Sequence, residues 1–101
     1  TVWGEPVTLF DGKTMTGWKL RDTTKKNGWA VVNGELAVVE PTDNADLVSE
    51  RTFQDMKLHI EFNVDPKSNS GVYLEGEPGP LMLQGDHGKV RFRNIVVTPA
   101  L

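Results

Sequence analysis

The sequence contains no cysteine among its 101 residues. This absence excludes disulfide bonds, thiolate metal sites and cysteine nucleophiles. Cysteine usage therefore leaves open whether the protein works in a reducing or an oxidising compartment.

Long apolar runs are also missing from the sequence. No stretch approaches the ~20 apolar residues of a transmembrane helix, and no basic start precedes an apolar segment of the kind that forms a signal peptide. We therefore expect no membrane partner. Because the chain begins at Thr1 rather than at methionine, we expect that an upstream segment has been removed, and export of the parent protein stays open.

Basic residues are not in excess. Eleven Lys and Arg residues against 14 Asp and Glu residues give a net charge of −3 and a pI near 5.3. Nucleic-acid binding needs a concentrated basic surface, so we expect no nucleic-acid partner. The 38% hydrophobic and 25% charged residues are typical of a globular protein, and residues 1–101 are interpreted as one small domain.

Helical periodicity is absent as well. No window of a dozen residues keeps apolar groups at i, i+3, i+4 and i+7, whereas short apolar runs alternate with turn residues along the chain. This pattern predicts eight or nine short strands. The expected fold class is all-β, an antiparallel β-sandwich or jelly roll.

The pair Asn33-Gly34 is the clearest local signal. Both residues tolerate the positive φ that a two-residue type I′ turn requires, which predicts a hairpin in which Val31 faces Leu36. Both faces of this hairpin are apolar. We therefore expect it to lie inside the sandwich or under a neighbouring segment, not at a solvent-facing edge.

Two apolar arms flank a polar loop in residues 81–97, which read LMLQGDHGKVRFRNIVV. Glycines bracket Asp86 and His87 in that loop. The run predicts a β-hairpin with a turn of four or five residues. This turn carries the most reactive side chains of the chain.

Apolar and polar residues alternate strictly from Lys57 to Val64, which predicts a strand. The apolar set, which we expect in the core, consists of Leu58, Ile60, Phe62 and Val64. The polar set includes His59 and Glu61. It is either an ordinary solvent-exposed face without a binding role or one wall of a binding surface.

General catalytic motifs are absent. The sequence has no phosphate-binding glycine loop, no GxSxG elbow, no HExxH and no EF-hand loop. The two histidines, His59 and His87, are far apart in the sequence. Two histidines alone are a weak metal signal unless carboxylates such as Glu61 or Asp86 lie beside them.

A polar sheet face is typical of sugar binding in sandwiches. Aromatic rings pack on the C–H faces of pyranoses, while carboxylates and amides bond the hydroxyls. The residues that we expect on such a face, with the Asp86-His87 turn at its rim, are Tyr73, Glu75, His59 and Glu61.

Five segments carry a resemblance to a known family. They read LFDGKTMTGW, GWAVVNGELAV, DLVSERTFQDMKLHIEFNV, NSGVYLEG and GPLMLQGDHGKVRFRNIVV, and they cover nearly the whole chain. In this order they resemble the signatures of the 3-keto-disaccharide hydrolase family. The resemblance implies a concanavalin A-like jelly roll, a periplasmic or secreted location and action on sugars, including cleavage of glycosides oxidised at C3.

The family resemblance also implies a shortening. Members of the family carry a long central region between the segments that match NSGVYLEG and GPLMLQGDHG. In this chain Gly76 is followed directly by Glu77-Pro78-Gly79-Pro80. We therefore expect a truncated jelly roll with a deletion junction near residues 76–80. We expect no strand through this cluster of breakers.

The resemblance assigns roles to individual residues. It implies His87 as a catalytic general base or metal ligand and Glu61 as the second acid/base or ligand, with a divalent cation as the cofactor that would suit them. Together with the polar sheet face, it gives as expected substrate-binding residues Asn69, Tyr73, Glu75, Gln84, Asp86 and His59. Arg93 and Asn94 match the FRN signature, where we expect an arginine paired with a carboxylate and an asparagine at a bulge.

Three functions compete: an active sugar-processing enzyme, a carbohydrate-binding module without turnover, and a structural scaffold. Catalytic groups must be held to within about 0.5 Å by a supporting shell. Loss of the central strands therefore favours sugar binding with reduced or no catalysis. Because lost strands uncover apolar faces and edges, we also expect a homodimer or a domain-swapped assembly.

Overall fold

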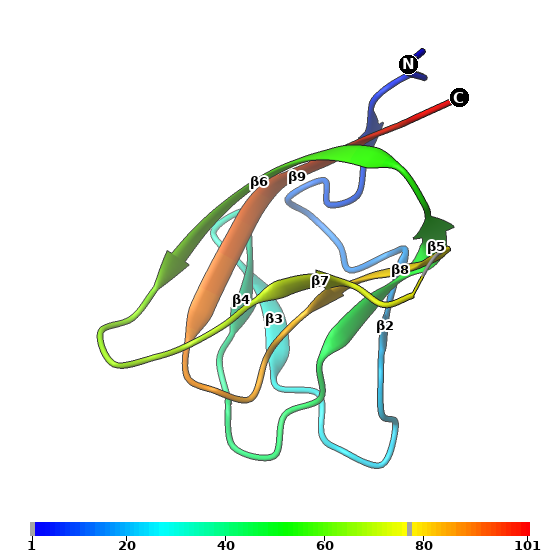
Figure 1. Ribbon diagram of the computed structural model, residues 1–101. Coiled ribbons are helices and arrows are strands. Elements are labelled where there is room, and N and C mark those ends of the chain that lie inside the picture. The colour runs from blue at the N-terminus through cyan, green and yellow to red at the C-terminus, as the bar shows by residue number, and fades with distance from the viewer. Residues whose placement is uncertain (1, 77) are drawn as a thin grey trace.

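The computed structural model describes residues 2–76 and 78–101, and these form nine strands and no helix. Two antiparallel sheets curl around a shared core (Figure 1), which confirms the predicted all-β sandwich. The strands are β1 (Val7–Thr8), β2 (Trp18–Leu20), β3 (Trp29–Val32), β4 (Glu35–Val38), β5 (Leu47–Phe53), β6 (Met56–Val64), β7 (Val72–Leu74), β8 (Gly79–Leu83) and β9 (Val90–Pro99). The described part of the chain offers no helix long and apolar enough to cross a bilayer.

Strand β9 is the centre of the five-stranded sheet. It pairs with β6 along one side over nearly its whole length. On its other side β4 pairs with its first half and β1 with its second half, and β3 follows beyond β4. Within the described ranges, β6, β3 and the two-residue β1 therefore each have a free edge in this sheet.

The four-stranded sheet has the order β2-β5-β8-β7. Its strands β7 and β8 form a tight hairpin in which Leu74 pairs with Leu81 and the Glu75 N–H donates to the Pro80 carbonyl (2.9 Å). A Cβ at Gly79 would collide with the Glu75 carbonyl oxygen, so this close approach requires glycine. As expected, the strand before residues 76–80 does not continue through them, since β7 ends at Leu74, but the next strand begins earlier than predicted, at Gly79. Glu77 in the predicted junction lies outside the described residues.

The Asn33-Gly34 hairpin forms with the predicted register. Val31 pairs with Leu36, and φ is +52° at Asn33 and +78° at Gly34. The expectation that both faces are covered is wrong, because β3 ends the sheet and Val32 on its outer face is 39% exposed. Turn geometry depends on two adjacent residues, whereas the covering of a face depends on what the rest of the chain places there.

The predicted hairpin of residues 81–97 does not form. Its arms belong to different sheets, since β8 lies in the four-stranded sheet and β9 in the five-stranded sheet. Residues 84–89, which we call the crossing loop, carry the chain between them. This loop is tied elsewhere: the Gly85 N–H donates to Asp46 Oδ1, and the Asn69 N–H donates to the His87 carbonyl. The arms therefore diverge.

The inner faces of both sheets form one hydrophobic core. Trp29 and Phe92 stack with ring centroids 6.1 Å apart. The indole N–H groups of Trp18 and Trp29 each donate to a backbone carbonyl at 2.7 Å, so these buried rings leave no donor unsatisfied. The largest fully buried apolar side chains are Phe92, Leu36, Leu47, Leu81, Leu83, Ile95, Val90 and Val97.

The inner face of β6 is only partly covered. Leu58, Ile60 and Val64 pack against the core as predicted, but Phe62 is 64% exposed although it lies on the same face, opposite Phe92. In Figure 1, β6 and β7 border an open side of the sandwich, with no described strand between them. An apolar groove of about 250 Å³ remains there, lined by Ile60, Phe62, Val64, Ser70, Gly71, Val72 and Phe92.

Candidate functional site

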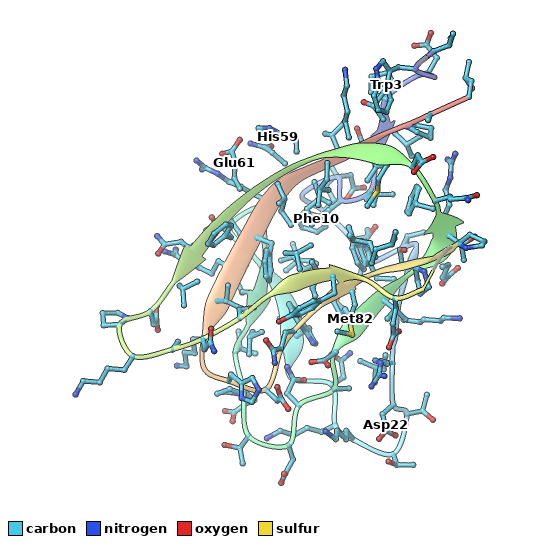
Figure 2. The ribbon with its side chains drawn as sticks, viewed as in Figure 1. Trp3, Phe10, Asp22, His59, Glu61 and Met82 are labelled. Atoms are coloured by element: carbon cyan, nitrogen blue, oxygen red, sulfur yellow. The ribbon has the colours of Figure 1, made fainter. Side chains whose placement is uncertain are left out.

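Glu61 is the centre of a polar cluster on the outer face of the five-stranded sheet. Its Oε1 accepts a hydrogen bond from Arg93 Nε (2.9 Å), and its Oε2 accepts one from Asn94 Nδ2 (2.9 Å). His59 Nε2 lies 3.1 Å from the same Oε2. Figure 2 shows His59 and Glu61 pointing from β6 away from the interior that Phe10 fills.

A bulge in β9 brings Asn94 to Glu61. The register between β6 and β9 shifts between His59 and Glu61, so β9 accommodates an extra residue there. Asn94 has φ of +51°, a left-handed conformation that asparagine tolerates better than most residues. The predicted pairing of Arg93 with a carboxylate and the predicted bulge at Asn94 are both confirmed.

These contacts hold the pKa of Glu61 at about 2, below its ordinary value of 4.5. The hydrogen bond from Asn94 is the largest cause, followed by those from His59 and Arg93, because each favours the ionised carboxylate. Near neutral pH Glu61 is therefore an anion that accepts hydrogen bonds and has no proton to donate. This chemistry suits binding and orientation better than acid catalysis by this residue.

A shallow depression of about 530 Å³ adjoins Glu61 on this face. Arg91 Nη1 donates to Glu35 Oε1 at 3.3 Å, so two arginine–glutamate pairs stand near each other across neighbouring strands. Guanidinium and carboxylate groups present donors and acceptors in fixed planar arrays. The polar side chains that line the depression, which we call the arginine–glutamate surface, are Glu35, Glu61, Asn63, Arg91 and Arg93.

Asp86 and His87 lie in the crossing loop. His87 Nε2 is 3.4 Å from Asp86 Oδ1, an ion-pair distance for a protonated imidazole. That oxygen is buried, and no group in the described ranges makes a hydrogen bond to it. The Asn69 N–H donates to the His87 carbonyl (2.7 Å) and the Gln84 N–H to the Gly71 carbonyl (3.0 Å), so two loops meet here.

Tyr73 and Glu75 occupy the outer face of the four-stranded sheet. Tyr73 is 48% exposed and pairs across the hairpin with Met82. The carboxylate of Glu75 accepts a hydrogen bond from Arg21 Nε. This face is the opposite side of the sandwich from Glu61.

A family model decides the ancestry of the chain. The model of the 3-keto-alpha-glucoside-1,2-lyase-like domain matches residues 5–78. The chain belongs to this family. The 3-keto-disaccharide hydrolase of Bacteroides thetaiotaomicron is 27% identical over 75 residues, which cover 66% of this chain and 26% of that protein. The chain therefore spans about a quarter of the length of this curated relative. No solved structure matches the chain.

The match to the 3-keto-alpha-glucoside-1,2-lyase-like family ends at Pro78, in the turn before β8. Strands β1 to β7 lie in the matched range, and with them His59, Glu61 and Tyr73. Strand β9 and the crossing loop lie beyond it. The arginine–glutamate surface thus combines matched residues of β4 and β6 with residues of β9 outside the match.

The predicted site residues of this family member do not share one face. Strand alternation assigns a side chain to a face of its own sheet, but it does not say which sheet the strand joins. The structure therefore divides the predicted residues among three places. These are the outer face of the five-stranded sheet (His59, Glu61), the outer face of the four-stranded sheet (Tyr73, Glu75) and the meeting point of two loops (Asn69, Gln84, Asp86, His87).

The divalent cation that the resemblance implied finds no ligand set in this part of the family domain. Among residues 2–76 and 78–101, no three histidine, aspartate or glutamate side chains are close enough together to hold a metal ion. The two closest pairs are His59–Glu61 and Asp86–His87. Each pair supplies two groups, whereas structural and catalytic zinc sites use at least three protein ligands.

Asn44 is a polar residue that the sequence analysis missed. It is 1% exposed, its Oδ1 accepts a hydrogen bond from the Gly28 N–H (2.6 Å), and its Nδ2 donates to the Gly85 carbonyl (2.8 Å). Asn44 therefore ties the start of β3 to the crossing loop. In the sequence it stands in a polar stretch typical of an exposed loop, and its two partners are distant along the chain, so no local pattern points to it.

Proposed function

We propose that this domain binds carbohydrate through the arginine–glutamate surface, with reduced or no catalysis. The supporting observation is that two ion pairs, Arg93–Glu61 and Arg91–Glu35, line one depression. Their side chains hold one another in position before a ligand arrives. Less conformational entropy is then lost when sugar hydroxyls bind to them.

The proposed ligand class is a disaccharide, including one oxidised at C3. The curated relative is a 3-keto-disaccharide hydrolase, and the matching family is named for a 3-keto-alpha-glucoside-1,2-lyase. Sugar hydroxyls donate to carboxylates such as Glu35 and Glu61. Arginine N–H groups donate to hydroxyl and keto oxygens, which accept.

Binding is favoured over turnover by the protonation state of Glu61. A catalytic acid or base works best with a pKa near the operating pH, whereas that of Glu61 is about 2. On the same face, His59 is the second titratable group in contact with it. The geometry supports a fixed anion that orients an imidazole and accepts ligand hydrogen bonds.

A second candidate function is glycoside hydrolysis or elimination at His87. It is favoured by Asp86 Oδ1, which is buried beside His87 without a hydrogen-bond partner in the described ranges. A carboxylate in that position would orient the imidazole as a general base. Turnover without a requirement for Arg91 would point to this function.

We also propose that the chain self-associates, as a homodimer or a domain-swapped assembly. The supporting observations are the groove of about 250 Å³ between β6 and β7 and the exposed Phe62 on an inner sheet face. An unpartnered apolar face beside a free strand edge favours association.

Ligand-observed NMR tests the carbohydrate proposal. We expect saturation transfer to trehalose, or to 3-ketotrehalose, at millimolar sugar concentration, with no product detected by chromatography. Arg91→Ala should weaken binding by about tenfold, because an arginine that bonds a ligand contributes roughly 1.4 kcal/mol or more.

The matched control is Arg51→Ala. Arg51 is exposed on β5 of the other sheet, and its guanidinium lies over Phe53, away from the depression. This change should leave sugar binding unaltered. Absence of saturation transfer to both sugars with the folded wild-type chain would contradict the proposal, as would equal losses in the two variants.

A further inference from the structure

The free edge of β6 is the longest of the described molecule. This strand runs over nine residues, Met56–Val64, and its ladder partner within the described ranges is β9 alone. The other strands with a free edge, β1, β2, β3 and β7, have two to four residues each. A long edge with unpaired N–H and C=O groups is a template for a further strand.

We propose that two copies of this chain pair β6 against β6, antiparallel, around a two-fold axis at Ile60. The two five-stranded sheets then become one continuous sheet. This inference rests on the self-association proposed above and specifies its surface and its register. The occupant of the edge is a second copy, because the strand is complementary to itself in one register.

The length of β6 selects that register. In a symmetric antiparallel pair, the inner faces of the two strands lie on the same side of the sheet only if one residue pairs with its own copy across the two-fold axis. Ile60 is the central residue of Met56–Val64, so an axis there pairs every residue of the strand. An axis at Phe62 leaves the first four residues of β6, Met56–His59, without a partner in the other strand. An axis at Glu61 places two carboxylates directly opposite each other, which is destabilising.

The Ile60 register also places complementary polar groups opposite each other on the outer face. It sets His59 of each copy opposite Glu61 of the other, and this contact occurs twice by symmetry. Glu61 is ionised through its bonds to Arg93 and Asn94, and His59 already lies 3.1 Å from it within one copy. In the dimer, each Glu61 carboxylate therefore lies between His59 of its own copy and His59 of the other copy.

On the inner face the same register covers the exposed apolar group. It places Leu58 of one copy opposite Phe62 of the other, and Ile60 opposite Ile60. Phe62 is the most exposed apolar side chain of β6, and Leu58 lies partly buried on the same face. Cross-strand pairs of an aromatic with an aliphatic residue stabilise a sheet by about 0.2–1 kcal/mol each.

Pairing through the edge leaves the outer faces open. The two arginine–glutamate surfaces then stand side by side on one sheet. A ligand with two sugar sites at the right spacing would engage both, which raises the apparent affinity without new contacts.

Single cysteines test the register, because the chain has none of its own. We would oxidise Ile60→Cys, Glu61→Cys and Phe62→Cys separately with oxidised glutathione and follow the covalent dimer on a non-reducing gel. The Ile60 variant should cross-link, because equal residues face each other only on the axis. Cross-linking of Glu61→Cys or Phe62→Cys in preference to it would overturn the register.

A charge change tests the surface without touching the core. His59 is exposed, so His59→Glu should fold, and it sets a glutamate opposite Glu61 of the other copy. We expect the dimer dissociation constant, measured by sedimentation equilibrium, to rise by about tenfold or more. Thr8→Glu is the matched control: it adds a carboxylate on the same outer face, in β1, across β9 from the edge.

The outcomes separate this inference from the proposals on which it rests. A monomer over about a hundredfold concentration range would overturn both the self-association and the β6 pairing. A dimer that neither cross-links at Ile60→Cys nor responds to His59→Glu would overturn the β6 surface alone. Sugar binding is measured independently by NMR, so its failure leaves the dimer result intact.

Discussion

The chain has two histidine–carboxylate pairs, and in each the histidine lies within two residues of the carboxylate. The two pairs differ in their surroundings. Glu61, beside His59, receives hydrogen bonds from Arg93 and Asn94 and has a pKa of about 2. Asp86, beside His87, has a buried oxygen to which no described group donates. The first pair stands on a sheet and the second in the crossing loop.

The difference shows what determines the role of a carboxylate. Both pairs have the residue types of an acid–base site. The neighbouring strand β9 satisfies Glu61 and makes it a fixed anion, whereas the loop around Asp86 leaves an oxygen ready for a donor from a ligand or solvent. The following changes are designed to separate the two environments.

Asn44→Ala should have the largest effect, about 2–3 kcal/mol of lost unfolding free energy. The change leaves the buried Gly28 N–H and Gly85 carbonyl without their partner. Urea denaturation measures the loss, and NMR shifts should change in the crossing loop and not around Glu61. Asn63→Ala, at an exposed position of β6, is the control and should cost less than about 0.5 kcal/mol. Equal effects of the two changes would contradict the role of Asn44.

Asn94→Ala should destabilise the folded state by about 1–2 kcal/mol, because alanine disfavours the positive φ of this position. Asn94→Gly removes the same donor to Glu61 but permits the backbone conformation, so its cost should be smaller. Urea denaturation compares the two. If glycine costs as much as alanine, the bulge conformation is not the source of the effect.

Asp86→Asn should stabilise the fold, by less than about 1 kcal/mol, because it replaces a carboxylate that has an unsatisfied buried oxygen by a neutral amide. Thermal unfolding near pH 7 measures this change. Asp65→Asn, at an exposed turn position, serves as the comparison and should be neutral. A destabilised Asp86→Asn would show that the carboxylate has a donor in solution.

Glu61→Gln should alter the pH dependence of stability and have the smallest effect, because solvent screens the exposed group. The folded state lowers the pKa of Glu61 from 4.5 to about 2. Its stabilising contribution is therefore present above pH 4.5 and is lost as the pH falls toward 2. Urea titrations in this window should show a shallower acid slope in the variant than in the wild type. Glu50→Gln, on β5, should keep the wild-type slope.

The parts of the fold that depend on neighbouring residues were predictable. The Asn33-Gly34 turn and its register depend on two backbone conformations, and both are as expected. The strand from Lys57 to Val64 followed from alternation alone. The hairpin predicted for residues 81–97 was wrong, because two apolar arms around a loop look the same whether they pair or enter different sheets.

The candidate site was predictable only in pieces. His59 and Glu61 are two residues apart in one strand, so alternation places them on one face, and the FRN signature correctly indicated Arg93 and Asn94. Whether Tyr73 shares that face depends on which sheet β7 joins, and it joins the other one. The exposure of Phe62 could not be predicted for the same reason: the residue pattern of a strand does not show whether another strand covers its face.

The sequence by itself determined the all-β class, the positions of the strands and turns, and the ancestry, because these depend on short-range patterns and ordered motifs. The tertiary structure alone decided which strands share a sheet and which acids are satisfied. It also decided that Asn44 ties β3 to the crossing loop and that β6 ends its sheet with Phe62 uncovered. Those properties depend on contacts between residues far apart in the chain, which no local window contains.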